Sequence, residues 1–344
     1  MRLWTAIVAL GMSMLTGCAS TINLEVLQPA ALAVPQNVQT LAVVDRSRAK
    51  NVGQGVLGVL EGALTGEAIG ADTEGRVSAR QGLANALGAS PRFDVVTPDL
   101  KSKVVASSLF DAAGISWELA ERICAQENCD GIVTLEAFDS DSFTDVDTRR
   151  VEEEVDGKER VRTVYDVERR MSVLTSWQLY DVKNRQVLDN MRETSFARTW
   201  TATGDSEKQA RRDLPPQTAM VRDVAYVAGE AYGRRIAPSY ITVSRTYFSK
   251  GDDRFKAAKT RVRGLDWDGA ATIWSELTQS SDPKTKGRAF FNLALYSEVV
   301  GDLDRAIEQA QKANQILDKG STRRYVSTLS IRKADQARLA DQME

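Results

Sequence analysis

Two stretches near the carboxyl end of this 344-residue chain share one pattern, and they constrain the fold more than any other feature. The first is LDWDGAATIWSEL (265–277) and the second is GDLDRAIEQAQKA (301–313). Their alanines Ala270 and Ala306 lie 36 residues apart. Small and apolar residues recur in both stretches at helical spacing, and small side chains let two antiparallel helices approach closely. The pattern therefore predicts stacked helix pairs.

The period resembles that of the tetratricopeptide repeat, which is about 34 residues. Leu265 stands where that repeat usually has glycine, and a last helix over 323–339 is expected to cap the stack. The residues expected to pack the helices are small or aromatic: Ala270, Trp274, Phe290, Leu293, Ala294, Tyr296, Gly301, Ala306 and Ala313. We assign 250–344 to this all-α domain, with a generic pair of helical hairpins as the alternative.

The amino-terminal sequence MRLWTAIVALGMSMLTGCAS has the order of a bacterial secretion signal. One basic residue precedes an apolar run that is too short to be read as a membrane-spanning helix. The run ends in LTGC, which resembles the lipobox of bacterial lipoproteins. This resemblance implies a leader over 1–17 and lipid attachment at Cys18. The alternatives are an ordinary signal peptide with an incidental cysteine and a buried apolar helix.

Several acyl chains on Cys18 would hold the mature chain on a membrane, because several lipid groups anchor more stably than one. Ala19 and Ser20 carry no acidic group, which by resemblance to known sorting rules favours the outer membrane. We expect the chain to face the periplasm, with exposure at the cell surface as the alternative. Residues 18–37 contain two prolines and several small residues. We therefore expect this segment to be a lipidated tether.

The chain contains no histidine, which excludes several kinds of active site. A Ser-His-Asp triad, a Cys-His pair and histidine-ligated zinc all require that residue. The 45 basic and 47 acidic residues leave a formal net charge of -2, so no electrostatic pattern indicates nucleic acid. We expect a protein that is not an enzyme, with no cofactor and no metal, and we identify no small-molecule substrate.

Strand-like and helix-like segments alternate from 38 onward. TLAVVD, RFDVVTP and DGIVTLEAF predict strands, and GRVSARQGLANALGAS and ISWELAERICAQ predict helices. Alternating stretches such as RTVYDVE and MSVLTSWQLYD predict antiparallel strands with turns at Asp156-Gly157 and Lys183-Asn184. A long amphipathic helix is expected over 217–236. Together these segments predict an α/β sheet domain with an antiparallel meander over 38–249.

The order of these segments, with SWQLYDVKNRQVL in the meander, resembles the α/β domain of curli-secretion-type and TolB-amino-terminal-type envelope lipoproteins. A closer resemblance is to a bacterial lipoprotein family, without assigned activity, that adds helical repeats after this domain. The residues that carry it are PAALAVPQNVQTLAVVDRS, LEGALTGEAIGAD and RRIAPSYITVSRTYF. The resemblance implies architecture and supplies no chemistry.

Cys124 and Cys129 are five residues apart, and on one continuous helix their thiols would point to different faces. Asn128, Asp130 and Gly131 suggest that the helix ends before Cys129. The sequence therefore leaves open both a disulfide and two buried free thiols.

Two further motifs partly match known ligand-binding patterns. GQGVLG (53–58) matches the glycine pattern of dinucleotide sites, but seven residues separate it from the expected strand end at Asp45. We therefore interpret it as part of a contact loop. The acidic series Asp139, Asp141, Asp145 and Asp147 lacks the glycine and the final glutamate of a calcium loop, which favours a solvated hairpin.

Taken together, the anchor, the missing histidine and the repeats predict a non-catalytic envelope lipoprotein whose helical repeats bind a partner protein. One alternative is a secretion or pore-associated subunit like the curli exporter, although the segment 139–170 is highly charged for that role. A nucleotide-binding envelope enzyme is the weaker alternative.

Overall fold

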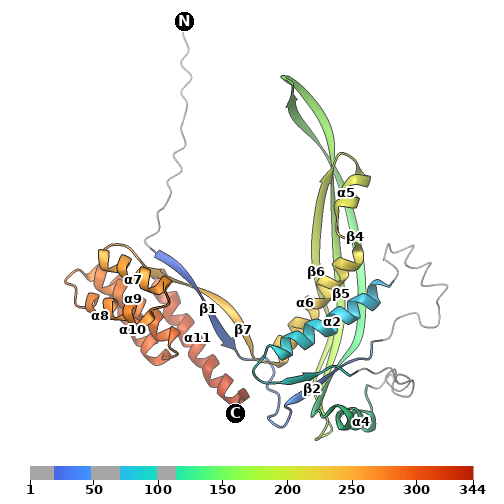
Figure 1. Cartoon of the computed structure of the whole chain (residues 1–344), viewed down its shortest axis with the longest axis horizontal. Coiled ribbons are helices and arrows are strands. Elements are labelled where there is room, and N and C mark those ends of the chain that lie inside the picture. Colours follow the sequence, from blue (N-terminus) through green and yellow to red (C-terminus); the bar gives the residue numbers. More distant parts are fainter. Residues whose placement is uncertain (1–18, 48–69, 99–113, 344) are drawn as a thin grey trace, which may run out of the picture. The chain divides into compact units, whose positions relative to one another are not determined.

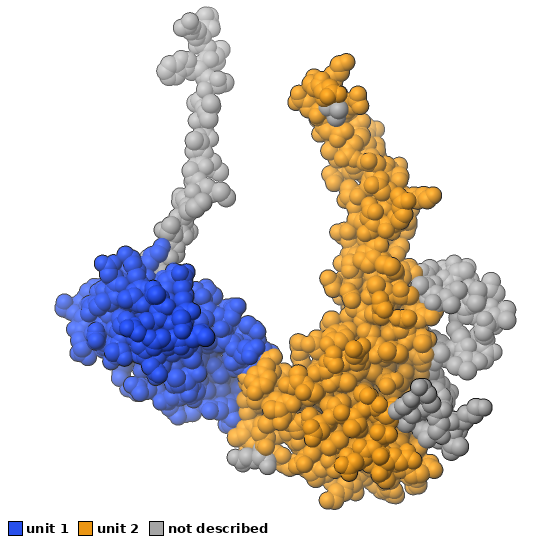
Figure 2. Space-filling view, viewed as in Figure 1, with its two compact units in different colours: residues 1–26, 241–338 blue, residues 27–240, 339–344 orange. Residues whose placement is uncertain are grey.

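The computed structural model describes residues 19–47, 70–98 and 114–343 (Figure 1). The predicted leader, Cys18 and the GQGVLG motif lie outside these residues. The chain forms two compact units: unit 1 comprises residues 1–26 and 241–338, and unit 2 comprises residues 27–240 and 339–344 (Figure 2).

Unit 2 is built on a five-stranded mixed sheet with the strand order β3-β2-β4-β5-β6. Its strands are β2 (Thr40–Asp45), β3 (Asp94–Val96), β4 (Gly131–Val155), β5 (Lys158–Asp181) and β6 (Gln186–Gly204). β2 pairs in parallel with β3 and β4, whereas β4, β5 and β6 pair antiparallel. The expected α/β sheet with an antiparallel meander is confirmed. Leu41 to Val44 of β2 are buried, because helices cover both faces of the sheet at this strand.

Helices cover both faces of this sheet near β2. α2 (Ala71–Gly88) and α6 (Gln217–Ile236) pack on one face, where the rings of Trp177 and Tyr232 stack with centroids 5.3 Å apart. α4 (Trp117–Glu127) packs on the other face through Leu119 and Ile123. The short helix α5 (Glu207–Asp213) follows β6. The sheet of unit 2 therefore lies between two apolar layers at this end.

Glycines allow α2 and α6 to approach backbone to backbone. A Cβ atom at Gly229 would lie 1.8 Å from the carbonyl oxygen of Ala79, and one at Gly82 would lie 2.1 Å from that of Tyr226. The hydroxyl of Ser78 donates to the carbonyl oxygen of Arg222 across the same contact (2.8 Å). No larger residue fits at either glycine without moving a helix.

In its described residues, unit 1 combines most of a two-stranded sheet with five helices, the last of which ends in unit 2. The strands are β1 (Ala19–Gln28) and β7 (Ser239–Phe248). The helices are α7 (Asp253–Arg263), α8 (Trp267–Leu277), α9 (Pro283–Val299), α10 (Leu303–Leu317) and α11 (Gly320–Met343). α7 packs against α8 and α9 packs against α10. The predicted all-helical region of packed helix pairs is confirmed, and α11 follows the second pair.

The two helix pairs repeat in detail. Asp266 caps α8 by accepting from the backbone of Gly269, and Asp302 caps α10 by accepting from the backbone of Arg305. The turn before each cap has a left-handed residue, Leu265 with φ 62° in the first pair and Gly301 with φ 84° in the second. The 36-residue spacing seen in the sequence therefore corresponds to a structural repeat.

Leu265→Gly is expected to raise the free energy of unfolding of unit 1 by about 0.5–1 kcal/mol. A left-handed conformation costs a residue with a Cβ about 1–2 kcal/mol, and the extra freedom of glycine in the unfolded chain offsets part of that gain. Leu265 is 76% exposed, so its removal sacrifices little burial.

Gly301→Ala should lower the free energy of unfolding of unit 1 by about 1 kcal/mol, because alanine must then adopt the left-handed conformation. The new Cβ has no atom within 4 Å, so no steric clash contributes. Urea unfolding of both variants tests this; an unchanged Gly301→Ala midpoint would refute it.

The segment expected to be a tether is folded where the structure describes it. β1 covers most of its first half, and Ile22 and Leu24 pack on the helices of unit 1. Further on, Ala30 is buried in unit 2 and exchanges two hydrogen bonds with the side chain of Gln342 (2.9 and 3.0 Å). The alternation of apolar and polar residues in STINLEV was the signal for this strand. Among the described residues, no helix is long and apolar enough to cross a membrane.

Candidate functional site

The hairpin of β4 and β5 extends beyond the rest of the sheet in unit 2. The two strands pair as far as Val155 and Lys158, whereas β6 ends at Gly204, opposite Tyr165. Residues 148–164 therefore form a two-stranded segment, here called the tip ribbon (Figure 1). Its turn is at Asp156 and Gly157, as the sequence predicted, and both have positive φ (54° and 73°), as a two-residue hairpin turn requires.

Most side chains of the tip ribbon are exposed on both faces. Val161 is 61% exposed, and Arg162 forms ion pairs with Glu153 and Asp205 that are open to solvent. Exposed ion pairs contribute little to stability, and an isolated two-stranded hairpin is marginally stable in water. Apart from Val164, which is buried at its base, the tip ribbon thus adds no core to unit 2.

Below the tip ribbon, the three strands form what we call the stem (139–147, 166–174 and 195–203). Directly paired residues of neighbouring strands point to the same face of a sheet. One face of the stem carries Val167, Met171 and Val173, which are buried against the helices of unit 2. The opposite face, here called the open face, is largely exposed, and Phe143 on it is 68% exposed.

The predicted acidic series lies on the open face. Asp139, Asp141, Asp145 and Asp147 occupy alternate positions along β4, so neighbouring carboxylates of the series start about 7 Å or more apart along the strand. Within the described residues, no three His, Cys, Asp or Glu side chains are arranged to hold a metal ion. The geometry fits a solvated hairpin better than a calcium loop.

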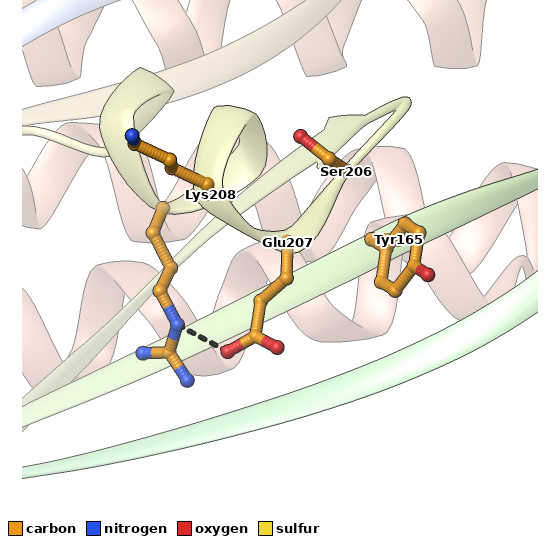
Figure 3. Close-up of a pocket in the computed structure, with 5 residues that line it drawn as sticks. Tyr165, Ser206, Glu207 and Lys208 are labelled. Carbon is orange, nitrogen blue, oxygen red and sulfur yellow. Dashed lines mark hydrogen bonds and ion pairs between the residues drawn. The ribbon is translucent and has the colours of Figure 1, made fainter.

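A shallow depression lies where the tip ribbon meets α5 (Figure 3). Its volume is about 510 Å³, and it is lined by Tyr165, Ser206, Glu207, Lys208 and Arg211. Glu207 and Arg211 form an ion pair across it (2.6 Å). The lining has no nucleophile paired with a base, and we assign it no chemistry.

Two family models match this chain. The family described as a domain of unknown function, DUF8603, matches residues 38–248, and a second domain of unknown function, DUF6340, matches residues 256–331. The first match spans more than half of the chain. The chain belongs to the DUF8603 family. No curated protein matches it.

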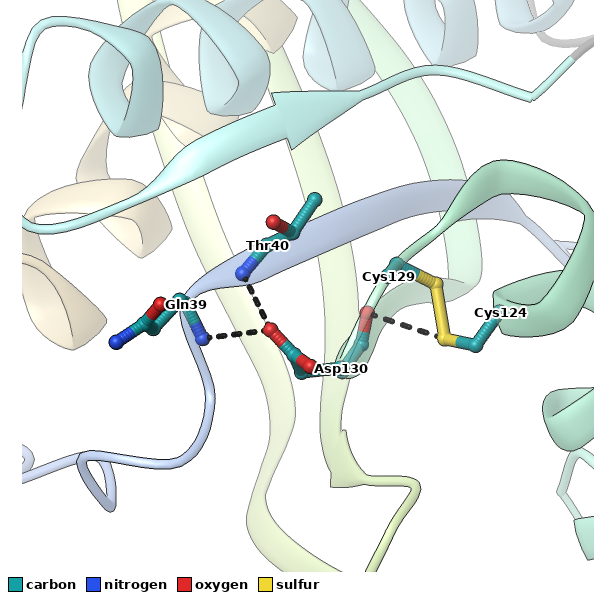
Figure 4. Close-up of a disulfide and its surroundings, with 6 residues drawn as sticks. Gln39, Thr40, Cys124, Cys129 and Asp130 are labelled. Atoms are coloured by element: carbon teal, nitrogen blue, oxygen red, sulfur yellow. Dashed lines mark hydrogen bonds between the residues drawn. A yellow bond between two sulfur atoms is a disulfide. The ribbon is translucent and has the colours of Figure 1, made fainter.

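The DUF8603 match includes the pair Cys124 and Cys129, which the structure joins in a disulfide with Cα atoms 4.4 Å apart (Figure 4). Asn128 has the left-handed φ of 55° that ends α4, so the chain folds back and Cys129 donates its backbone N–H to the carbonyl oxygen of Cys124. Asp130 then accepts from the backbones of Gln39 and Thr40 (3.1 and 3.0 Å). The disulfide thus closes the loop that leads into β4.

Replacing both cysteines, as in Cys124→Ser/Cys129→Ser, should lower the free energy of unfolding of unit 2 by about 2 kcal/mol. That magnitude is the loop-closure entropy that a crosslink of this short span removes from the unfolded chain. Urea unfolding with and without reductant provides the measurement. Reductant should lower the midpoint of the wild type and leave the double variant unchanged; a wild type insensitive to reductant would contradict the prediction.

A polar cluster lies in the DUF8603 domain where β2 ends, beside the first part of β4. Arg46 is buried and donates to Glu136 (3.2 Å), whose other oxygen accepts from Thr134 (2.5 Å). Ser47 is also buried and donates through its backbone and hydroxyl to Asp45 (2.9 and 2.6 Å). These hydrogen bonds join the residues that follow β2 to the first part of β4. The GQGVLG motif that follows it lies outside the described residues.

Asp72 stands at the start of α2 beside this cluster. Burial raises the pKa of its carboxyl above the ordinary value, against the opposing effect of hydrogen bonds from Ser140. Both the backbone and the hydroxyl of Ser140 donate to Asp72 (3.1 and 2.6 Å). Asp72 therefore ties the first turn of α2 to β4.

In unit 1, β7 covers one face of α9. Asn292 forms two hydrogen bonds with the backbone of Phe248: its oxygen accepts from the N–H (2.8 Å) and its nitrogen donates to the carbonyl (2.7 Å). Phe248 also contacts the ring of Phe291, with centroids 5.2 Å apart. The amide side chain of Asn292 on α9 thus holds the extended backbone of β7 through both its donor and its acceptor.

A buried carboxylate strengthens the same contact. The side chain of Glu298 on α9 is 0% exposed and accepts from Arg245 of β7 (2.9 Å) and from Arg332 of α11 (2.7 Å). Tyr325 donates to its second oxygen (2.7 Å). Burial opposes ionisation, but these hydrogen bonds outweigh it and hold the pKa of Glu298 below the ordinary value. Sequence reasoning missed these polar residues, although Asn292 and Glu298 lie among the apolar residues FFNLALYSEV of α9.

The residues predicted to pack the repeats lie between the helices. Ala270, Trp274 and Leu293 are buried in one cluster of unit 1, with Tyr296 at its edge. Ala294, Ala306 and Ala313 are buried in a second cluster, with Phe290 at its edge, and Gly301 forms the turn. The hydroxyl of Tyr296 also donates to Asp268 of α8 (2.6 Å). These residues pack the interior of unit 1 and do not form an exposed binding face.

Proposed function

We propose that this chain is a non-catalytic, lipid-anchored assembly module of the bacterial cell envelope that acts by binding protein partners. The tip ribbon is the observation that carries the proposal. It extends beyond β6, and apart from the buried Val164 at its base it exposes most side chains on both of its faces. An extended hairpin with such small intrinsic stability gains most when a partner covers it.

β7 already occupies one face of α9, so a partner protein that binds the repeats must use another surface. Solenoid repeats present extended surfaces to partners, and here the side chains of Asn292 and Glu298 are already engaged by this chain's own strand. The repeats retain other exposed apolar side chains, Val300 and Ile331. We propose the tip ribbon as the primary contact and the outer surface of the repeats as the secondary one.

The anchor in this proposal is Cys18, which lies in the sequence LTGC. The resemblance to envelope lipoproteins supports a location at the outer membrane, facing the periplasm. In cells, the Cys18→Ser variant should move from the membrane fraction to the soluble fraction and lose acyl labelling. A variant that stays fully membrane-bound without acylation would contradict the anchor.

Site-specific photocrosslinking in intact cells tests the binding function. A photoreactive amino acid replaces Val161 in the tip ribbon, or Val227 on α6 as a control with similar exposure in the same unit. We expect a defined crosslinked protein from position 161 and none from position 227. The full chain is used, because β1 and β7 form part of unit 1 and a fragment starting at α7 lacks both. Absence of any product at position 161, with normal protein levels, would contradict the proposal.

A further inference from the structure

The open face of the stem is strongly acidic. β4 contributes Asp139, Asp141, Asp145 and Asp147, and their partners on β5 add Asp166 and Glu168. Arg170, opposite Phe143, is the one basic residue among the β5 partners in this part of the face. The aligned residues of β6 are small, namely Ser195, Ala197, Thr199, Thr201 and Thr203, so a second sheet can approach closely.

The same side of the tip ribbon is basic. The alternation of β4 and β5 continues from the stem to the turn without a bulge beyond Ala137. Arg149 on β4 and Lys158, Arg160 and Arg162 on β5 therefore point to the same side as the acidic residues of the stem. Glu153 is the only acidic residue among them on this side of the tip ribbon.

Arg162 pairs with Glu153 and Asp205 of its own chain, but most of the acidic residues of the stem lie too far from Lys158 and Arg160 to pair with them along one extended hairpin. Arg149 and Asp166 meet where the tip ribbon joins the stem (2.6 Å). In the strand register, Arg160 lies opposite Glu153, which is eight positions from Asp145 along β4. At the rise of a strand this is about 26 Å, too far for Arg160 and Asp145 to form an ion pair. A second molecule that lies antiparallel on this side brings each tip ribbon onto the other molecule's stem.

We propose that a second copy of this chain binds the open face, with the tip ribbon of each copy lying on the stem of the other. A two-fold axis near Asp147 and Asp166 relates the two copies. It makes the two contacts between tip ribbon and stem equivalent, as in an isologous dimer. Phe143, which is exposed on the open face, supplies an apolar contact at the centre of each half. This proposal rests on the proposed function and names one partner of the assembly module.

Complementary charge reversal tests the dimer. The stem variant is Asp141→Lys/Asp145→Lys and the tip variant is Lys158→Glu/Arg160→Glu, all at exposed positions where circular dichroism should show an unchanged fold. Sedimentation velocity of the full-length protein in detergent should show a dimer that weakens with salt, because salt screens exposed charges. Each variant alone should dimerise about tenfold or more weakly, because like charges then face each other.

An equimolar mixture of the two variants should restore dimerisation. In the mixed dimer the basic stem of one variant meets the acidic tip ribbon of the other, and the second contact keeps the wild-type pairing of an acidic stem with a basic tip ribbon. A wild type that stays monomeric at every concentration, variants that dimerise like the wild type, or a mixture without rescue would each overturn the proposal. A monomeric wild type with a crosslinked partner at Val161 would overturn this proposal alone. Absence of any crosslink at Val161 would count against the proposed function instead.

Discussion

Glu298→Ala should lower the free energy of unfolding of unit 1 by about 3 kcal/mol or more. Removing one member of a buried ion pair leaves its partners uncompensated, which typically costs about 3–5 kcal/mol. Here Arg245 and Arg332 lose their shared carboxylate, and Tyr325 loses the acceptor of its buried hydroxyl. Arg245 and Arg332 are partly exposed, which places the expected loss near the lower end of that range.

Urea unfolding followed by far-ultraviolet circular dichroism measures this loss, because unit 1 carries five helices. Glu308→Gln is the matched control, since Glu308 forms a solvent-exposed pair with Lys312 and its replacement should change the free energy of unfolding far less. Equal effects of the two substitutions would show that the buried network does not stabilise unit 1.

The same residue predicts a dependence on pH. The folded pKa of Glu298 lies below the unfolded value, so the folded state favours the ionised form. Its stabilisation is therefore fully present above the unfolded pKa, about 4.3, and is lost as the pH falls through the folded pKa. Between these limits, the wild type should lose stability more steeply on acidification than Glu298→Gln. Parallel curves for the two proteins would contradict the assignment.

Gly229→Ala should lower the free energy of unfolding of unit 2 by about 3 kcal/mol. Overpacking a tight contact typically costs about 1–3 kcal/mol, and here the new Cβ meets backbone rather than a movable side chain. It would lie 1.8 Å from the carbonyl oxygen of Ala79 and 2.9 Å from the nitrogen of Leu83. α2 and α6 must separate, which also opens the apolar layer that both helices place on the sheet.

Gly88→Ala is the control for this prediction, because a Cβ at Gly88 has no atom within 4 Å. It removes a glycine from the end of α2 and should leave unit 2 equally or slightly more stable. Thermal unfolding of both variants provides the comparison. If Gly229→Ala unfolds at the wild-type temperature, the close approach of α2 and α6 does not hold in solution.

The sequence by itself determined the elements that local pattern defines. The spacing of Ala270 and Ala306 predicted the helix pairs because helix contact depends on small residues at a regular period. The apolar run of β2 and the alternation along β5 predicted a sheet with a meander, and Asp156-Gly157 predicted its turn. Each signal lies within one short stretch, so composition and periodicity suffice to find it.

Only the tertiary structure showed which segments far apart in the sequence contact one another. β1 and β7 form one sheet although more than 200 residues separate them, and the side chain of Asn292 binds β7 rather than a free peptide. The extent of the tip ribbon depended on where β6 ends, and only the register of β4 with β5 showed that the acidic and basic residues share one side. Such contacts are selected by packing and hydrogen bonding between segments far apart in the chain, and no local period of the sequence records them.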